Sequence, residues 1–482
     1  MARPVALHPR PLLAAAFLAL VLPLGVVLAV ITPPGQVADE VGHIERATAL
    51  SEGHVLGVRG YTVDADGVWR RAAGVYGEPG PALAAFGPLP EGRALSAEEI
   101  VATRRRGWFG RDSFLQISPL AVYLPLFYVP SAAGIAVARS LGADPTRTLL
   151  AGRLVGLVVY AALGLTALLV TRRGRALLFC ALALPMSLSL GASFNQDGLL
   201  FAASALAAAL ASRGPEEQRA RLGAAVLICV VATVKLPYLV LAALLLPPLG
   251  GGGGRGHPWS ALRARLRLTA LVSLPALGWT AYAMVAISVP VPWPAYAAGP
   301  LWPGPAGQVF DALDAAAQLR VLVADPALVL TLPLRTIAAS PWLARQTVGV
   351  LGWLSIPLPG WLYAAWAVAV GCALGADGIG LGRRPLAGQV ADGAFLAVAA
   401  LAGVILIYVS QYLVWTPVGA DLIAGPQGRY LLPLLPMLAV AVPKVTRGPD
   451  GLRAALCAPA VAVALAGLAA IPPLIVASFY LR

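Results

Sequence analysis

The residues best suited to chemistry stand close together in residues 33–46, which read PPGQVADEVGHIER. The proline pair ends the preceding apolar segment, and Asp39 and Glu40 suit the first turn of a new helix, where the helix dipole favours negative charge. On that helix Asp39, His43 and Arg46 are spaced i, i+4, i+7 and share one face. Such a face can hold a reactive site in which Asp39 or Glu40 deprotonates a hydroxyl, but the same residues also suit an ordinary capped surface helix.

The composition is that of a polytopic membrane protein. Of 482 residues, 59% are hydrophobic and 12% are charged, which is far from the average of soluble domains. The net charge of +13 does not indicate nucleic-acid binding, because much of it lies in short loops between apolar runs, where it sets orientation. We therefore expect one integral membrane domain over residues 1–482, with an uncleaved first span at 12–31 and free cysteines.

The apolar runs and the basic clusters between them predict the topology. A crossing needs about 20 residues, or fewer where the bilayer thins. If every basic cluster after residue 172 is cytoplasmic, neighbouring clusters must be separated by an even number of crossings, and the candidate segments satisfy this rule. The candidates are 12–31, 117–139, 148–171, 176–194, 198–212, 222–235, 236–249, 268–289, 356–376, 391–414, 430–443 and 454–477.

Segment 117–139 is the exception to this count. If it crossed, every later basic cluster would be inverted, and its prolines at 119, 125 and 130 interrupt it, so we expect it to lie in the outer interface. The alternative is that 319–340 or another segment changes the count. The prediction is an all-α bundle of about eleven crossings. Its N-terminus is cytoplasmic and its C-terminus extracytoplasmic, with outer loops at 32–147, which carries interfacial helices and a strand-like stretch near 54–76, and at 290–355, which has little regular structure.

This topology gathers ionisable residues at the outer ends of several spans. Arg153 begins one span, Asp197 follows Asn195 in a short outer turn, Lys235 ends another span, and Arg429 precedes Tyr430. Arg153, Lys235 and Arg429 can hold a phosphate, and Asp197 can bind a divalent ion together with Asp39. Snorkelling of basic side chains to the headgroups is the alternative, although it does not explain Asp197.

Five sequence blocks resemble one known family. They are PPGQVADEVGHIERA at 33–47, NQDG at 195–198, KLPY at 235–238, GVLGW at 349–353 and QGRYLLPLLP at 427–436. This pattern, over about residues 12–440, resembles domain-of-unknown-function family 2142, whose predicted membrane proteins look like the GT-C glycosyltransferase superfamily.

The resemblance implies transfer of a sugar from a polyprenyl-phosphate-linked donor to a cell-envelope glycan or lipid acceptor on the outer face of the cytoplasmic membrane. By that analogy Asp39, with Glu40, matches the catalytic acid of the first loop and Asp197 the acid of the second, with Mg²⁺ or Mn²⁺ as the divalent ion. Many superfamily members pair two acids in the second loop, whereas Asp197 stands alone beside Asn195. The substrate-binding candidates are His43, Arg46, Arg153, Asn195, Asp197, Lys235, Arg429 and Tyr430. The alternatives are a transporter or flippase of lipid-linked sugars and a non-catalytic scaffold with the same fold.

Overall fold

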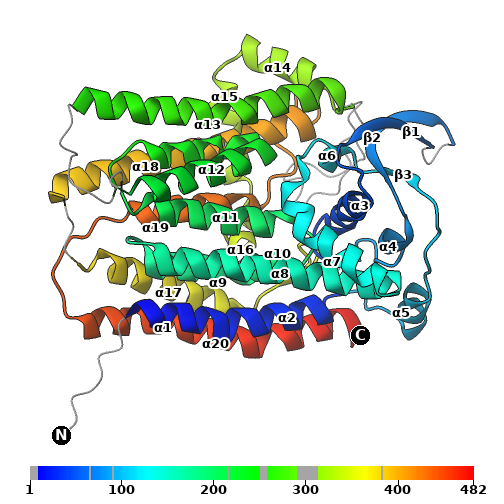
Figure 1. The fold of residues 1–482 in the computed structure, drawn as a ribbon, viewed down its shortest axis with the longest axis horizontal. Helices are drawn as coiled ribbons and strands as arrows, with labels where there is room; N and C mark the ends of the chain where they lie inside the picture. Colours follow the sequence, from blue (N-terminus) through cyan, green and yellow to red (C-terminus); the bar gives the residue numbers. More distant parts are fainter. Residues whose placement is uncertain are drawn as a thin grey trace, which may run out of the picture.

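The chain folds into a layered bundle of helices with a small sheet beyond one end (Figure 1). This computed structural model describes residues 9–63, 67–89, 92–214, 217–249, 258–289, 313–380 and 384–481. Most long helices run side by side in the same direction or its reverse, as expected where every backbone polar group must be satisfied within its own segment. The architecture is that of a polytopic membrane protein, mostly helical as predicted.

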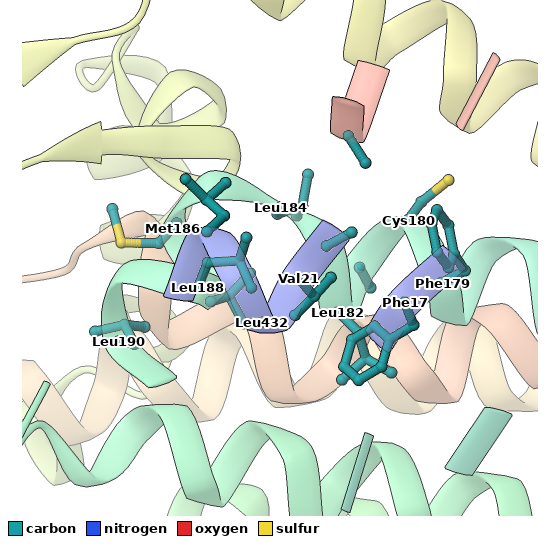
Figure 2. Close-up of a cluster of buried hydrophobic side chains, with 14 of the residues drawn as sticks. Phe17, Val21, Phe179, Cys180, Leu182, Leu184, Met186, Leu188, Leu190 and Leu432 are labelled. Atoms are coloured by element: carbon teal, nitrogen blue, oxygen red, sulfur yellow. The ribbon is translucent and has the colours of Figure 1, made fainter. Parts of the chain in front are cut away.

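The first span is one long apolar element with a local irregularity. Helix α1 (Pro9–Ala16) continues through a π-helical turn, η1 (Phe17–Val21), into α2 (Leu22–Ile31). The turn brings Phe17 and Val21 into the main core, where they lie among side chains of α9 (Arg175–Ala183) and α10 (Pro185–Gly191) (Figure 2). Residues 12–31 therefore form the predicted first span.

The segment after α2 holds both short helices and a sheet. Helix α3 (Glu40–Ser51) begins where the proline pair and acidic residues predicted it. Strands β1 (Val58–Val63), β2 (Trp69–Gly77) and β3 (Ser113–Gln116) form an antiparallel sheet in the order β1-β2-β3, which confirms strands near 54–76. An all-α fold is thus too narrow a description. Helices α4 (Gly80–Leu83) and α5 (Ala97–Arg104) complete this part.

Segment 117–139 is broken into three pieces, as its prolines predicted. They are α6 (Ser118–Ala121), a 3₁₀ turn η2 (Pro125–Tyr128) and α7 (Val129–Ser140). The longest has 12 residues, which is short for a crossing. Pro125 and Pro130 stand in the first turns of η2 and α7, where a missing N–H costs no hydrogen bond.

Each of the other predicted segments contains helix. By length and hydropathy, five helices of the described residues can cross a membrane, or seven if each of two bent pairs is one span. The bent pairs are α10 with α11, at 114°, and α14 with α15, at 107°. The remaining helices are α8 (Pro145–Val170), α11 (Gln196–Ala211), α12 (Gln218–Val234), η3 (Leu236–Leu245), α13 (Pro258–Ala286), α14 (Ala315–Ala324), α15 (Leu328–Ala338), α16 (Leu343–Gly349), α17 (Gly360–Gly378), α18 (Leu386–Trp415), η4 (Gly428–Leu434), α19 (Leu435–Ala441) and α20 (Asp450–Tyr480).

The predicted loop 290–355 differs from expectation. Residues 290–312 lie outside the described part, but 313–355 contain α14, α15 and α16, together with strand β4 (Val350–Leu351), which pairs with β5 (Ile356–Pro357). The expectation of little regular structure is wrong here because residues 315–338 are mostly apolar, with a break at Asp325-Pro326. Proline disfavours helix in the residue before it, so the run forms two helices with a sharp bend between them.

The basic clusters meet at the end of the bundle away from the sheet. Arg172 donates a hydrogen bond to the carbonyl of Arg213 (3.0 Å). Arg173 donates to the carbonyls of Leu249 (3.2 Å) and Val442 (3.0 Å). Arg265 donates to the carbonyl of Leu246 (2.9 Å). Clusters far apart in the sequence therefore share one end, as the rule of even crossings requires.

The chain begins and ends its helical part at opposite ends of the bundle. The Tyr480 hydroxyl, in the last turn of α20, donates to the carbonyl of Ile31, in the last turn of α2 (3.0 Å). The two helices thus finish together at the sheet end, while α1 starts at the other end (Figure 1). This arrangement agrees with the predicted placement of the two termini on opposite sides.

Candidate functional site

A cavity of about 740 Å³ opens where the bundle meets the sheet. Its wall is made by α3, the segment around α6, the α12–η3 junction, α13, α18 and the start of η4. These elements are far apart in the sequence, and together they contribute both charged and apolar side chains. Of the predicted residues, Asp39, His43, Asp197, Lys235, Arg429 and Tyr430 line the cavity.

Asp39 joins the start of α3 to the C-terminal part of the chain. Its backbone adopts the left-handed conformation (φ 64°), which aspartate tolerates better than most residues. Its side chain does not cap α3 and instead pairs with the Arg429 guanidinium. The Asp39 side chain is 37% exposed and that of Arg429 is 2% exposed. The Asp39 carboxylate is therefore accessible from the cavity, while the guanidinium that pairs with it is buried.

Arg429 is fixed by several neighbours. It donates to the carbonyl of Ala38 (2.8 Å) and to the Tyr430 hydroxyl (3.3 Å). Its Nε lies 3.7 Å from an Asp197 oxygen and has no hydrogen-bond partner among the described residues. The preceding Gly428 allows the start of η4 to pack closely against α16, because a Cβ there would lie 2.4 Å from the backbone nitrogen of Thr347.

Asp197 is held at the bend between α10 and α11. Its backbone N–H is capped by the Asn195 side chain (2.9 Å), which also donates to the carbonyl of Ala38 (3.0 Å). Gly198 is needed here, because a Cβ would lie 2.7 Å from the backbone of Leu190 and Gly191. The bend therefore places the Asp197 carboxylate beside α3.

Lys235 completes a network of two acids and two bases. It pairs with Asp197, and its ammonium lies 5.2 Å from the ring centroid of Tyr123 and 5.1 Å from that of Tyr430. Tyr238, on the next turn, donates to the carbonyl of Tyr430 (3.0 Å). The KLPY and QGRY blocks are thus in direct contact.

Glu40 and Arg153 are excluded from the cavity and serve the fold instead. The Arg153 guanidinium makes a bidentate contact with the Glu40 carboxylate (2.8 and 2.6 Å). It also donates hydrogen bonds to two carbonyls at the end of α2, those of Ala29 (3.0 Å) and Thr32 (2.6 Å). Glu40 accepts from the backbone N–H groups of Gly35 (2.9 Å) and Phe194 (3.1 Å). The side chains are 0% and 2% exposed, and neither residue lines the cavity, so neither is available to a substrate.

Two further predicted residues on α3 are buried. His43 contacts the Tyr128 hydroxyl through Nδ1 (2.6 Å), and burial lowers the pKa of His43 to about 3, so its imidazole is neutral near pH 7. Arg46 is fully buried and donates to the carbonyl of Val55 (2.8 Å). Arg46 thus anchors the loop after α3 rather than facing the cavity.

Glu45 is a cavity residue that the sequence analysis did not nominate. It lies in the same opening stretch, lines the cavity, and has no hydrogen bond or ion pair among the described residues. Burial raises the pKa of Glu45 to about 7. The spacing rule that selected Asp39, His43 and Arg46 passed over Glu45, although Val41, Gly42 and Glu45 share a second helix face at i, i+1 and i+4.

A divalent ion does not fit this site. Asp39 faces Arg429, while Asp197 faces both Lys235 and Arg429. No group of three metal-ligating side chains occurs in the described ranges. Two carboxylates already paired with cations do not offer the open set of oxygen ligands that Mg²⁺ or Mn²⁺ needs, so the predicted metal pair is not supported by its surroundings.

The fold and the long apolar helices define a multi-pass membrane protein. Its family follows from the sequence: residues 22–438 match the family described as "Predicted membrane protein (DUF2142)", and the chain belongs to that family. This confirms the resemblance based on the five blocks. No curated protein and no solved structure matches the chain.

The buried Glu40–Arg153 pair generates a stability prediction. Glu40→Gln leaves the Arg153 charge uncompensated inside the protein, and removing one partner of such a pair costs about 3–5 kcal/mol. We expect a clear drop in the temperature at which the purified protein loses its monodisperse peak in size-exclusion chromatography.

The matched control is Arg93→Gln, which removes the exposed partner of Glu99. Exposed pairs contribute about 0–1 kcal/mol, so this variant should stay close to the wild-type temperature. Equal effects of the two substitutions would contradict the structural role of Glu40.

Proposed function

We propose that the protein is a glycosyltransferase of the GT-C type. It transfers a sugar from a polyprenyl-phosphate donor to a glycan or lipid acceptor of the cell envelope, at the outer face of the cytoplasmic membrane. One observation carries the proposal: a partly exposed carboxylate, Asp39, pairs with Arg429 at the wall of a cavity that also has apolar sides, and Asp197 links Arg429 to a second cation, Lys235.

The two cations suit the phosphate of the donor. Arg429 lines the cavity, and its buried Nε–H has no hydrogen-bond partner among the described residues. Lys235 uses one ammonium contact on Asp197, and the rings of Tyr123 and Tyr430 flank it. Guanidinium and ammonium groups bind phosphate oxygens by charge-assisted hydrogen bonds. In our proposal the phosphate takes these donors, and its charge replaces part of the pairing with the two aspartates.

The apolar walls suit the lipid part of the donor. Trp279 and Met284 of α13 and Ile407 and Val414 of α18 line the cavity. Outside the cavity, α13 exposes large apolar side chains such as Val285, which is 77% exposed, as expected for a helix that faces lipid. A cavity of this size suits a headgroup and its sugar, so the polyprenyl chain extends into the bilayer.

In the proposed reaction Asp39 accepts the proton of the acceptor hydroxyl. The acceptor oxygen then forms a bond to the anomeric carbon of the sugar. The bond between that carbon and the phosphate oxygen breaks, and the electron pair leaves with polyprenyl phosphate. Arg429 and Lys235 stabilise the charge that develops on the leaving phosphate.

A second candidate is a transporter or flippase of lipid-linked sugars. The observation that favours it is the pair of bent spans, because broken helices commonly form transport sites. Asp197 lies at one of these bends, that between α10 and α11. Purified protein in liposomes that moves labelled polyprenyl sugar across the bilayer without transferring it to an acceptor would establish this alternative; a non-catalytic scaffold would do neither.

The role of Asp39 generates the first activity prediction. Asp39→Asn keeps the side-chain shape but removes the proton acceptor, and general-base catalysis contributes about 10²–10⁴-fold. Sugar incorporation into envelope material from labelled polyprenyl-phosphate hexoses should fall by that factor, and the variant should fail to restore the glycan profile of a deletion strain.

The control for Asp39 is Asp112→Asn, which changes an exposed acid that contacts His54 outside the cavity. It should retain activity. Wild-type transfer by Asp39→Asn, with normal membrane expression, would exclude Asp39 as the base.

The phosphate role generates a prediction about donor binding. Arg429→Gln removes a buried cation, and a hydrogen bond to a charged group is worth about 1.5–3 kcal/mol, so the donor KM should rise about 10- to 100-fold. The acceptor KM should change less. Arg335→Gln, on the exposed side of α15, should leave both constants unchanged, and an unchanged donor KM in Arg429→Gln would remove the phosphate role.

The orientation is part of the proposal and has its own test. The basic clusters favour the cytoplasm at their end of the bundle, which puts the sheet outside. In a variant that lacks the native cysteines, a membrane-impermeant maleimide should label a cysteine at Tyr61, on the exposed face of β1, in intact cells. A cysteine at Leu452, exposed at the start of α20, should react only after permeabilisation. The reverse pattern would invert the topology.

A further inference from the structure

Glu45 is a cavity carboxylate that is not paired with a base within the described ranges. Asp39 pairs with Arg429, and Asp197 pairs with Lys235. Glu45 lines the same cavity and has no ion pair or hydrogen bond with any described residue. An ionisable group that is desolvated without a partner is costly to the fold, and such groups are concentrated at binding and catalytic sites.

The position of Glu45 separates it from the phosphate site. It lies five residues beyond Glu40 on α3, about 8 Å further along the helix axis. Beside it, Gly42 faces Leu120 so closely that a Cβ there would lie 2.6 Å from that side chain. Asp39 precedes the first residue of α3 and Glu45 follows in its second turn, so the two carboxylates are placed to contact different parts of a bound molecule.

In the described part of the chain, no base forms an ion pair with Glu45. Burial alone raises the pKa of Glu45. The parts of α13 and α6 that line the cavity contribute no charged side chain. The titratable and charged groups that face the cavity are Asp39 and His43 of α3, Tyr123, Asp197 of α11, Lys235, Tyr238 of η3, and Arg429 and Tyr430 of η4. Those on the elements around α3 are Arg70, Arg71 and Tyr76 of β2, whose side chains are exposed, together with Tyr128 of η2, which contacts His43, and Arg139 of α7, which pairs with Glu52. Arg59 of β1 donates to main-chain carbonyls.

We propose that Glu45 binds hydroxyl groups of the acceptor and makes the cavity specific for a polyhydroxylated, carbohydrate-type acceptor. The identification of this ligand as the acceptor rests on the proposed function. An ionised carboxylate accepts hydrogen bonds from two hydroxyls of one sugar, whereas a fatty acyl group offers none. The ligand thereby supplies the hydrogen-bond donors that the protein does not.

The proposal fixes the direction of a pH dependence. Only the ionised form of Glu45 accepts with both oxygens, so hydroxyl donors favour that form and lower its pKa on binding. Binding of a sugar should therefore become tighter as the pH rises through about 7, the range in which free Glu45 loses its proton. His43 does not titrate in this range, since burial lowers the pKa of His43 to about 3.

The experiment measures binding rather than transfer. Full-length protein in lipid nanodiscs is titrated with n-hexyl glycosides of neutral hexoses, and the fluorescence of the cavity tryptophans, among them Trp279, Trp353 and Trp415, reports occupancy. Hexanol is the probe that lacks the sugar hydroxyls. Wild type should bind the glycosides about three- to tenfold more tightly at about pH 8 than at about pH 6.

Glu45→Gln should abolish this dependence, because the amide resembles the protonated acid at every pH. Its affinity should equal that of wild type at the lower pH, while its affinity for polyprenyl phosphate stays unchanged. Glu98→Gln, which removes an exposed carboxylate on α5 outside the cavity, should behave as wild type. The proposal is overturned if wild-type affinity does not change with pH, if Glu45→Gln keeps the change, or if glycosides bind no better than hexanol.

The two proposals fail in different ways. If glycosides bind with the dependence on Glu45 but no polyprenyl-phosphate sugar is transferred, the carbohydrate site remains and the transferase proposal falls. If transfer occurs with normal acceptor binding by Glu45→Gln, the transferase remains and the role of Glu45 falls.

Discussion

The structure depends on one buried ion pair, that between Glu40 and Arg153. Arg153 ties the last carbonyls of α2 to α8, and Glu40 ties the start of α3 to the turn that precedes α11. Desolvating two charges costs several kcal/mol each, and excellent geometry with further hydrogen bonds is needed to offset that cost. Here the donors and acceptors match closely, so the pair fixes where the first span ends and how α3 leaves it.

That constraint positions the cavity. Arg153 fixes the position of Glu40. The adjacent Asp39 adopts the left-handed backbone conformation, and its side chain points away from Glu40 toward Arg429. The neighbouring carbonyl of Ala38 accepts hydrogen bonds from both Asn195 and Arg429. Trp353 donates to the carbonyl of Gly35 in the same turn (2.8 Å). The five sequence blocks therefore lie close together in the structure. Within the first block two adjacent acids have different roles: Glu40 supports the fold and Asp39 faces the cavity.

The sequence predicted the scaffold better than the individual side chains. Hydropathy and the spacing of arginines depend on the bilayer, which acts on every segment in the same way, so the helices and the shared end of the basic clusters followed from them. The sequence did not predict that Glu40 and Arg153 are excluded from the cavity. A buried ion pair and an open binding site use the same residue types. Glu45 was passed over because the residues of α13 and α6 that line the cavity with it are distant from it in the sequence. The helices at 315–338 were missed because the prolines and tryptophans around them suggested a loop.

The account stands on the claim that Lys235 and Arg429 hold a lipid phosphate at the sheet end of the bundle. The most direct measurement is a cryo-electron microscopy structure of the full chain in nanodiscs with added polyprenyl phosphate. We expect phosphate density within hydrogen-bonding distance of the Lys235 ammonium and the Arg429 guanidinium, with the polyprenyl chain leaving between α13 and α18. Phosphate density at the basic end of the bundle, or a cavity still closed by the two aspartate pairs at saturating lipid, would contradict it.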